Sequence, residues 1–147
     1  MKPGWLLSHR FAAIAVVSGE LTVDCRPEHP VSVLIIHGTA DENLPYAGGV
    51  GRKALASHDV RPVRYALDTW RSRDHCPDSA SLAVSGSLAQ SAWAPCAEGT
   101  AVEVYRISGG GHAWPGGERM SPLLDAPSTA LEATPVIWAF FASHPKR

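Results

Sequence analysis

The stretch Val31–Tyr46, VSVLIIHGTADENLPY, decides the fold that the sequence predicts. Its first part, Val31–Ile36, is a short apolar run rich in β-branched residues, which favours a strand buried on both faces of a parallel sheet. The run ends at His37 and Gly38, and Asp41 follows in a polar loop. Open α/β sheets build their sites on loops at the carboxyl ends of strands, so Asp41 is a candidate site residue. Taken alone, such an aspartate is more simply explained as a structural residue of its loop.

A second stretch has the same form, a strand over Ala101–Ile107 that leads into the glycines Gly109–Gly111 and then His112. The glycines allow the backbone to turn sharply, so that the His112 side chain can point into a site. Without a partner, His112 is a turn histidine bonded to the backbone. With Asp41 earlier in the chain, the two residues match the second and third members of a Ser–Asp–His triad. In a triad the carboxylate fixes the imidazole tautomer, and the imidazole takes the serine proton.

Two helices are predicted from the spacing of apolar residues. Pro62 is a favoured first helical residue, and the residues after it place one apolar face on a helix that stops near Asp74, formed by Val63, Ala66, Leu67 and Trp70. Thr134 before Pro135 predicts the N-cap and the first residue of a final helix that ends at His144. The buried face of this second helix is expected to comprise Val136, Ile137, Phe140 and Phe141.

Strands that alternate with helices predict the α/β class, with a mostly parallel sheet covered on both faces by helices. Phe11–Val17 is the expected first strand, and Ser79–Pro95 is expected to be irregular or a hairpin. The length of 147 residues corresponds to one domain, 1–147, or part of one, and an apolar fraction of 45% is ordinary for a globular protein.

Charge and residue spacing exclude several classes of partner. The 13 Lys and Arg residues balance 14 Asp and Glu residues without a basic cluster, so neither nucleic acid nor a membrane surface is an expected partner. The seven histidines include no pair at the spacing of a helical ligand set, so no metal is expected, and no cofactor motif is present. The apolar N-terminal run is interrupted by Ser8–Arg10 and lacks an A-x-A cleavage site, so it is not a convincing signal peptide.

Four groups of residues point to one known family. They are His37–Asp41 with Pro45 and Tyr46, Trp70 with Cys76, the G-G-H-A-W-P-G motif at Gly110–Gly116, and Ile137–Phe141. Together they resemble the polyhydroxybutyrate depolymerase and feruloyl esterase family of α/β-hydrolases, over about Ser8 to His144. The resemblance implies an extracellular serine esterase that acts on polyesters or plant phenolic esters, with Asp41 as triad acid and His112 as triad base. Dienelactone hydrolases share the order of acid and base but not the G-G-H-A-W-P-G motif.

The chain departs from this family in one large respect, because it contains no G-x-S-x-G nucleophile motif and no H-G-G-type oxyanion segment. The expectation is therefore a partial α/β-hydrolase fold, truncated at the N-terminus, whose missing segment would carry the nucleophile. Such a chain is expected to be inactive or poorly stable alone. Ser18 and Ser108 are the nearest spare hydroxyl groups in the sequence. The alternative is a non-catalytic remnant or binding module of the same fold.

The cysteines suggest a disulfide, and two aromatic residues are candidates for substrate binding. Cys76 and Cys96 flank the segment before the last strand, and a disulfide between them would fit the exported enzyme that the resemblance implies. Two buried free thiols are the alternative, and Cys25 is left without a partner. Trp114 and Tyr46 are candidate substrate-binding residues that would form walls of a pocket, or they only pack against their own loops.

Overall fold

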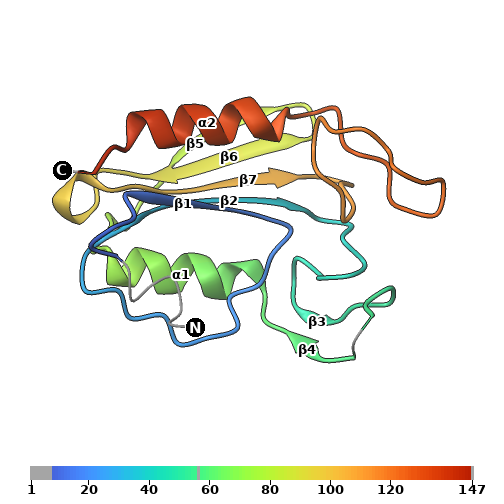
Figure 1. Ribbon diagram of the computed structural model, residues 1–147, viewed down its shortest axis with the longest axis horizontal. Helices are drawn as coiled ribbons and strands as arrows, with labels where there is room; N and C mark the ends of the chain where they lie inside the picture. The colour runs from blue at the N-terminus through green and yellow to red at the C-terminus, as the bar shows by residue number, and fades with distance from the viewer. Residues whose placement is uncertain (1–7, 56, 147) are drawn as a thin grey trace.

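A five-stranded mixed sheet forms the centre of the molecule in the computed structural model, which describes residues 8–55 and 57–146 (Figure 1). Trp5–Leu7, at the start of the apolar N-terminal run, lie outside the described residues. In spatial order, the strands of the sheet are β1 (Ala13–Val17), β2 (Ser32–Gly38), β7 (Val102–Ile107), β6 (Leu88–Trp93) and β5 (Ser81–Ser85). A separate antiparallel pair is formed by β3 (Gly49–Val50) and β4 (Asp59–Val60).

The strand β2 lies inside the sheet between β1 and β7, and both neighbours run parallel to it. All of its residues are buried, which confirms the prediction of a strand covered on both faces. The apolar side chains of β2 alternate between two clusters. Val33 and Ile35 belong to one cluster, and Leu34 and Ile36 belong to the other. The β-branched run of the sequence is therefore explained by a strand with no solvent-facing side.

One helix covers each face of the sheet (Figure 1). Helix α1 (Val63–Arg73) buries Val63, Leu67 and Trp70 against the Val33 cluster, as the helical spacing predicted. Pro62 is the N-cap of α1 rather than its first residue, and its backbone is extended. A short 3₁₀ turn, η2 (Ala97–Gly99), precedes β7.

Helix α2 (Ala133–Ser143) covers the opposite face and starts two residues earlier than predicted. Its N-cap is Glu132, so the prediction of Thr134 as N-cap is wrong. The Thr134 hydroxyl instead accepts a hydrogen bond from Trp114 Nε1 at 3.1 Å, and this tertiary contact takes the place of a capping bond. Phe140 is buried as expected, whereas Phe141 is 37% exposed and lies outside the buried face.

The predicted fold class, a partial α/β-hydrolase fold with a mostly parallel sheet, is contradicted by the strand directions. Only β1, β2 and β7 run parallel, and β6 and β5 continue the sheet in antiparallel pairing. The reason lies in the segment before β7, where Gly86 adopts a positive φ of 57° in the short turn between β5 and β6. The chain returns as a hairpin, which was one of the two predicted alternatives for this segment, rather than crossing over through a helix.

Two further observations concern the edge position of β1 and the length and polarity of the helices. Within residues 8–55 and 57–146, β1 pairs with β2 alone, so it forms one edge of the sheet, and it covers Ala13–Val17 of the expected first strand Phe11–Val17. Among these residues, no helix combines the length and the apolar character that a membrane span requires.

Candidate functional site

The candidate site lies where β2 and β7 end, because parallel neighbours deliver their following loops to the same edge of the sheet. Backbone hydrogen bonds join the two loops directly, from Thr39 N to Ile107 O and from Ala40 N to Gly110 O, both at 2.9 Å. The approach is so close that a Cβ atom at Gly38 would lie 2.1 Å from the Gly110 carbonyl oxygen. Glycine at position 38 is therefore required by the contact between the loops.

This arrangement brings the two predicted residues Asp41 and His112 together. His112 Nδ1 lies 2.9 Å from Asp41 Oδ2, although the residues are 71 positions apart in the chain. The Asp41 side chain is fully buried, whereas the His112 side chain is 39% exposed. An ionised carboxylate only accepts hydrogen bonds, so Nδ1 carries the proton of this bond and Nε2 of the neutral ring holds a free lone pair.

Further donors surround the Asp41 carboxylate. Its Oδ1 accepts hydrogen bonds from the backbone amides of Asn43 at 2.9 Å and Leu44 at 2.8 Å. Burial by itself would raise the pKa of Asp41, but hydrogen bonds from His37, the Leu44 amide and His112 outweigh it and hold that pKa well below its usual value. The carboxylate therefore stays ionised across the physiological pH range.

The residue His37, at the end of β2, lies directly beneath this carboxylate. Its ring is 2% exposed, and Nε2 lies 2.8 Å from the Leu44 carbonyl oxygen and 3.3 Å from Asp41 Oδ2. Because both oxygens are acceptors, Nε2 carries a proton that the two share. Tyr46 packs edge-on against the same ring, with centroids 5.7 Å apart. His37 thus orients the Asp41 loop from below.

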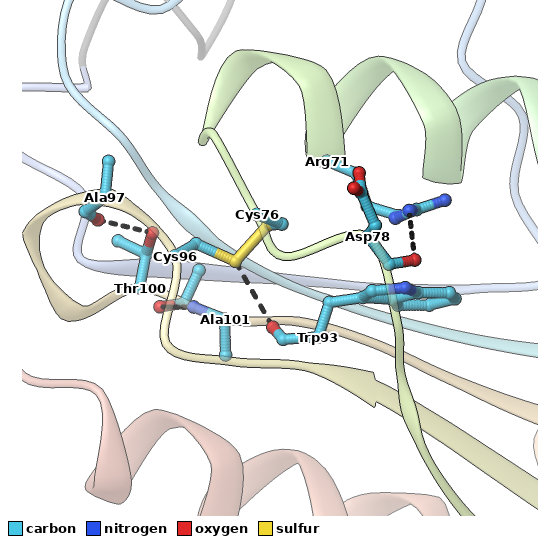
Figure 2. The surroundings of a disulfide bond; sticks show 9 residues. Arg71, Cys76, Asp78, Trp93, Cys96, Ala97, Thr100 and Ala101 are labelled. Atoms are coloured by element: carbon cyan, nitrogen blue, oxygen red, sulfur yellow. Dashed lines mark hydrogen bonds between the residues drawn. A yellow bond between two sulfur atoms is a disulfide. The ribbon is translucent and has the colours of Figure 1, made fainter.

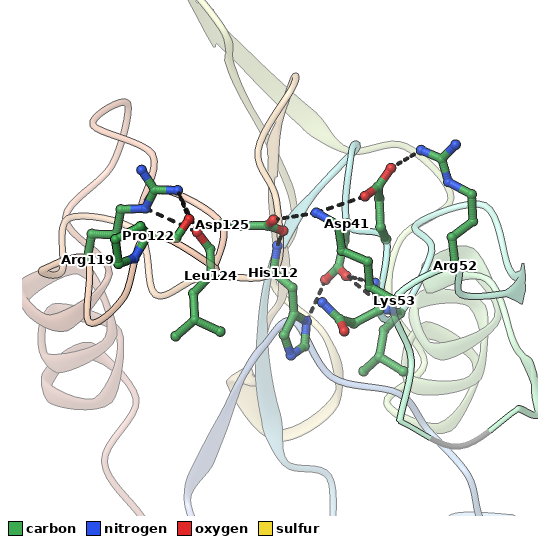
Figure 3. Close-up of polar contacts among 11 residues, drawn as sticks. Asp41, Arg52, Lys53, His112, Arg119, Pro122, Leu124 and Asp125 are labelled. Atoms are coloured by element: carbon green, nitrogen blue, oxygen red, sulfur yellow. Dashed lines mark hydrogen bonds and ion pairs between the residues drawn. The ribbon is translucent and has the colours of Figure 1, made fainter.

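A second set of polar contacts holds the His112 loop from the other side (Figure 3). Asp125 Oδ2 accepts a hydrogen bond from the His112 backbone amide at 2.8 Å, and Asp125 Oδ1 lies 3.0 Å from Lys53 Nζ. Lys53 Nζ also lies 2.9 Å from Glu42 Oε2, and Glu42 pairs with Arg52. The hydrogen bond from His112 and the contact with Lys53 lower the pKa of Asp125. Sequence reasoning missed these residues, because no local pattern connects Asp125 to His112.

A concave surface that encloses about 490 Å³ adjoins this network. Residues from the Asp41 side and from the His112 loop line it, and they include Lys53, Arg119 and Leu124. The two predicted substrate-binding residues lie elsewhere. Tyr46 packs on His37 and the core beside α1, and Trp114 is 48% exposed with its indole bonded to Thr134. Neither residue lines the concave surface.

The cysteines lie away from the Asp41–His112 pair. Cys76 and Cys96 form a disulfide that ties the segment after α1 to the loop after β6 (Figure 2). Beside it, the Arg71 guanidinium stacks 4.5 Å from the centre of the Trp93 ring and donates to the Asp78 carbonyl oxygen. Cys25 is a buried free thiol, and burial raises its pKa to about 11, which makes it a poor nucleophile.

No hydroxyl group of residues 8–55 and 57–146 is hydrogen-bonded to His112 Nε2. Ser18 lies at the same edge of the sheet, after β1, with a left-handed φ of 47°, and its amide is bonded to Ile36 O. The backbone of Ser108 is bonded to Ser87. In this same part of the chain, no three side chains gather as a set that could hold a metal ion.

Comparison with known proteins does not assign the chain to a family. The sequence matches no protein-family model, and no curated protein matches it.

Proposed function

We propose that this chain carries the acid and the base of a serine-type carboxylic ester hydrolase. The observation that supports this proposal is the 2.9 Å contact between Asp41 Oδ2 and His112 Nδ1, with the carboxylate buried and the imidazole facing solvent. A buried carboxylate that is kept ionised fixes the Nδ1–H tautomer, which leaves Nε2 available to take a proton. The low pKa of Asp41 also favours the imidazolium that forms during catalysis.

In this proposal the nucleophile is a serine on a segment outside the described residues. Its hydroxyl oxygen attacks the carbonyl carbon of the ester while His112 Nε2 takes the hydroxyl proton. The tetrahedral intermediate then collapses, and His112 returns the proton to the departing alkoxide, so that an alcohol leaves and an acyl-enzyme remains. Water repeats the sequence and releases the carboxylic acid.

Polyhydroxyalkanoates and feruloyl or other phenolic esters are the proposed substrates. The motifs quoted above support this choice, and so do the apolar side chains on the loop that follows His112. Met120 and Leu123 are 85% and 92% exposed, which suits an apolar substrate better than a polar one. The disulfide between Cys76 and Cys96 supports the proposal of an extracellular protein.

The test begins with the DNA upstream of the Met1 codon, read in frame for a strand followed by G-x-S-x-G. The encoded protein is then assayed on p-nitrophenyl butyrate and methyl ferulate. Asp41→Asn is expected to lower kcat by about 10⁴-fold and His112→Ala by about 10⁶-fold, with KM nearly unchanged. Glu118→Gln is the control, because Glu118 is an exposed carboxylate of the His112 loop whose loss should leave kcat unchanged.

Two outcomes contradict the proposal. One is an unrelated sequence or a stop codon upstream together with no hydrolysis by the 147-residue chain. The other is hydrolysis that survives in both Asp41→Asn and His112→Ala. If the 147-residue chain itself hydrolyses esters, Ser18→Ala and Ser108→Ala test whether one of these hydroxyl groups replaces the proposed external serine.

A non-catalytic binding module is the second candidate, and one observation favours it. His112 Nε2 has no hydroxyl partner among the residues that the structure describes, so the pair has nothing to activate within them. Such a module would bind an ester without hydrolysing it. Binding of ethyl ferulate to the 147-residue chain, unchanged in His112→Ala and without product release, would support this candidate over the enzyme.

A further inference from the structure

The carboxylate of Asp125 binds the backbone of the same histidine whose ring is bound by Asp41. We propose that Asp125 and Lys53 are positioning residues that hold His112 in the orientation needed for its contact with Asp41. The proposal rests on the function proposed above, because it concerns the base of that site. It adds two residues that act through His112 and not on the substrate.

The first support is that two carboxylates hold His112 at two separate points. Asp41 Oδ2 contacts ring Nδ1 at 2.9 Å, and Asp125 Oδ2 accepts the backbone amide at 2.8 Å. The ring contact alone leaves the backbone of His112 free to shift, since the loop 108–132 contains no helix or strand. The amide contact fixes the point from which the side chain projects.

Gly111 provides a second, independent support. A Cβ atom at Gly111 would lie 2.4 Å from Asp125 Oδ2, which is closer than any real contact. The absence of a side chain at this position therefore makes room for the Asp125 carboxylate. The glycine run thus makes two contacts possible. The Gly110 carbonyl oxygen accepts a hydrogen bond from the Ala40 amide in the Asp41 loop, and Gly111 leaves space for the Asp125 carboxylate beside His112.

Lys53 closes the network between the two loops (Figure 3). Its Nζ lies 3.0 Å from Asp125 Oδ1 and 2.9 Å from Glu42 Oε2, and its backbone amide is bonded to Glu42 O at 2.9 Å. Glu42 is the residue after Asp41, so a continuous chain of contacts runs from Asp41 through Lys53 and Asp125 to His112. The acid and the base are therefore linked both directly and through this second route.

The Lys53 and Glu42 side chains are partly exposed, which favours a positioning role over a contribution to global stability. The Lys53 side chain is 53% exposed and the Glu42 side chain is 27% exposed, so solvent screens their attraction and each ion pair adds little to global stability. Loss of the network should therefore change the state of the His112 ring while the melting temperature changes little.

The test measures the tautomer of His112 by NMR in the ¹⁵N-labelled 147-residue chain. Ring ¹⁵N shifts, read through the carbon-bound ring protons at pH 8.5, give the share of the Nδ1–H form without depending on slow proton exchange. In Asp125→Ala and Lys53→Met, the Nδ1–H share is expected to fall by at least about two-fold toward the Nε2–H form of a free imidazole, because the hydrogen bond to Asp41 sets the tautomer.

Two variants make the result specific. Asp125→Asn keeps an oxygen that can accept the His112 amide but gives up the ion pair with Lys53, so it should lose less of the Nδ1–H share than Asp125→Ala and about as much as Lys53→Met. Glu118→Gln removes an exposed carboxylate from the same loop and should leave the tautomer unchanged. Thermal unfolding of each variant shows whether the fold is intact, and Lys53→Met replaces Asp125→Ala if the latter does not fold.

A wild-type tautomer in both Asp125→Ala and Lys53→Met would overturn the positioning role, and so would a loss in Asp125→Asn equal to that in Asp125→Ala. The measurement uses no substrate, so its outcome is independent of the esterase assay. A tautomer shift in the variants without ester hydrolysis would support the positioning role and contradict the proposed esterase function. Ester hydrolysis that depends on His112, together with a tautomer that Asp125→Ala does not change, would support the esterase function and contradict the positioning role.

Discussion

Two buried aspartates in this molecule show how the surroundings of a carboxylate decide its charge. Asp41 receives hydrogen bonds from two backbone amides and from His112, so it stays ionised. Asp74, the C-cap of α1, is completely buried, and neither of its carboxylate oxygens has a hydrogen-bond partner among the described residues. Burial raises the pKa of Asp74 to about 7, and the nearby Val31 amide offsets this only in part.

Asp74 is expected to make the stability of the chain depend on pH. Its pKa rises from 3.8 in the unfolded chain to about 7 in the folded chain, so the folded state binds more protons between these values. The contribution of protonated Asp74 to the free energy of unfolding is fully present below about pH 4 and is lost as the pH rises through 7. Asp74→Asn cannot ionise, and its stability relative to wild type should increase by roughly 2 to 4 kcal/mol between pH 4 and pH 8.

Urea unfolding at several pH values checks this prediction. Asp78→Asn is the matched control, because Asp78 is exposed and follows the same helix. A difference between Asp74→Asn and wild type that stays constant from pH 4 to pH 8 would show that Asp74 is already ionised in the folded chain. The comparison cancels the opposite dependence of Asp41 and Asp125, whose lowered pKa values add stability that is lost only at acid pH.

At the residue scale, the proximity of two side chains could be predicted where each follows a recognisable strand. Asp41 and His112 could be paired because each lies in the loop that follows an apolar run, and parallel neighbours bring such loops together. Asp125 and Lys53 could not be found in this way. They lie in loops, and only the folded backbone shows that Asp125 faces Gly111.

At the scale of elements, the strands and helices themselves were predicted more reliably than their directions. The apolar patterns located β2, β7 and the buried face of α1. The sequence of β5 and β6 carries no apolar alternation strong enough to show that this hairpin would extend the sheet beside β7. The mixed sheet was therefore missed, because strand direction depends on long-range pairing and not on local pattern.

The disulfide is the main covalent link between elements, since it joins the end of α1 to the loop before β7. Cys76 and Cys96 are 20 residues apart, and closing a loop of this length should stabilise the fold by about 3 kcal/mol. The double variant Cys76→Ser/Cys96→Ser is therefore expected to melt at a lower temperature than wild type. Reduction of wild type should produce the same loss, and the double variant should not respond to the reductant. An unchanged melting temperature in the double variant would contradict this expectation.

At the scale of the whole molecule, the open edge of β1 is a surface on which association can occur. Ala12 O and Ser18 N are bonded to β2, so in a parallel ladder the even-numbered residues of β1 face β2. The amides of Ala13, Ala15 and Val17 therefore point away from the sheet. All residues of β1 are only half-buried, and such an apolar edge is prone to pair with another chain.

The 147-residue chain is accordingly expected to self-associate as its concentration rises, and Ala15→Pro is expected to prevent this. Proline at position 15 removes an amide that faces outward and leaves the ladder to β2 intact, because proline is tolerated at such edge positions. Ala15→Ser keeps the amide and should associate like wild type. Sedimentation velocity over a range of concentrations distinguishes the variants. A wild-type chain that remains monomeric and unfolds cooperatively would show that the β1 edge is already stable as it is, and equal association in Ala15→Pro would place the contact on another surface.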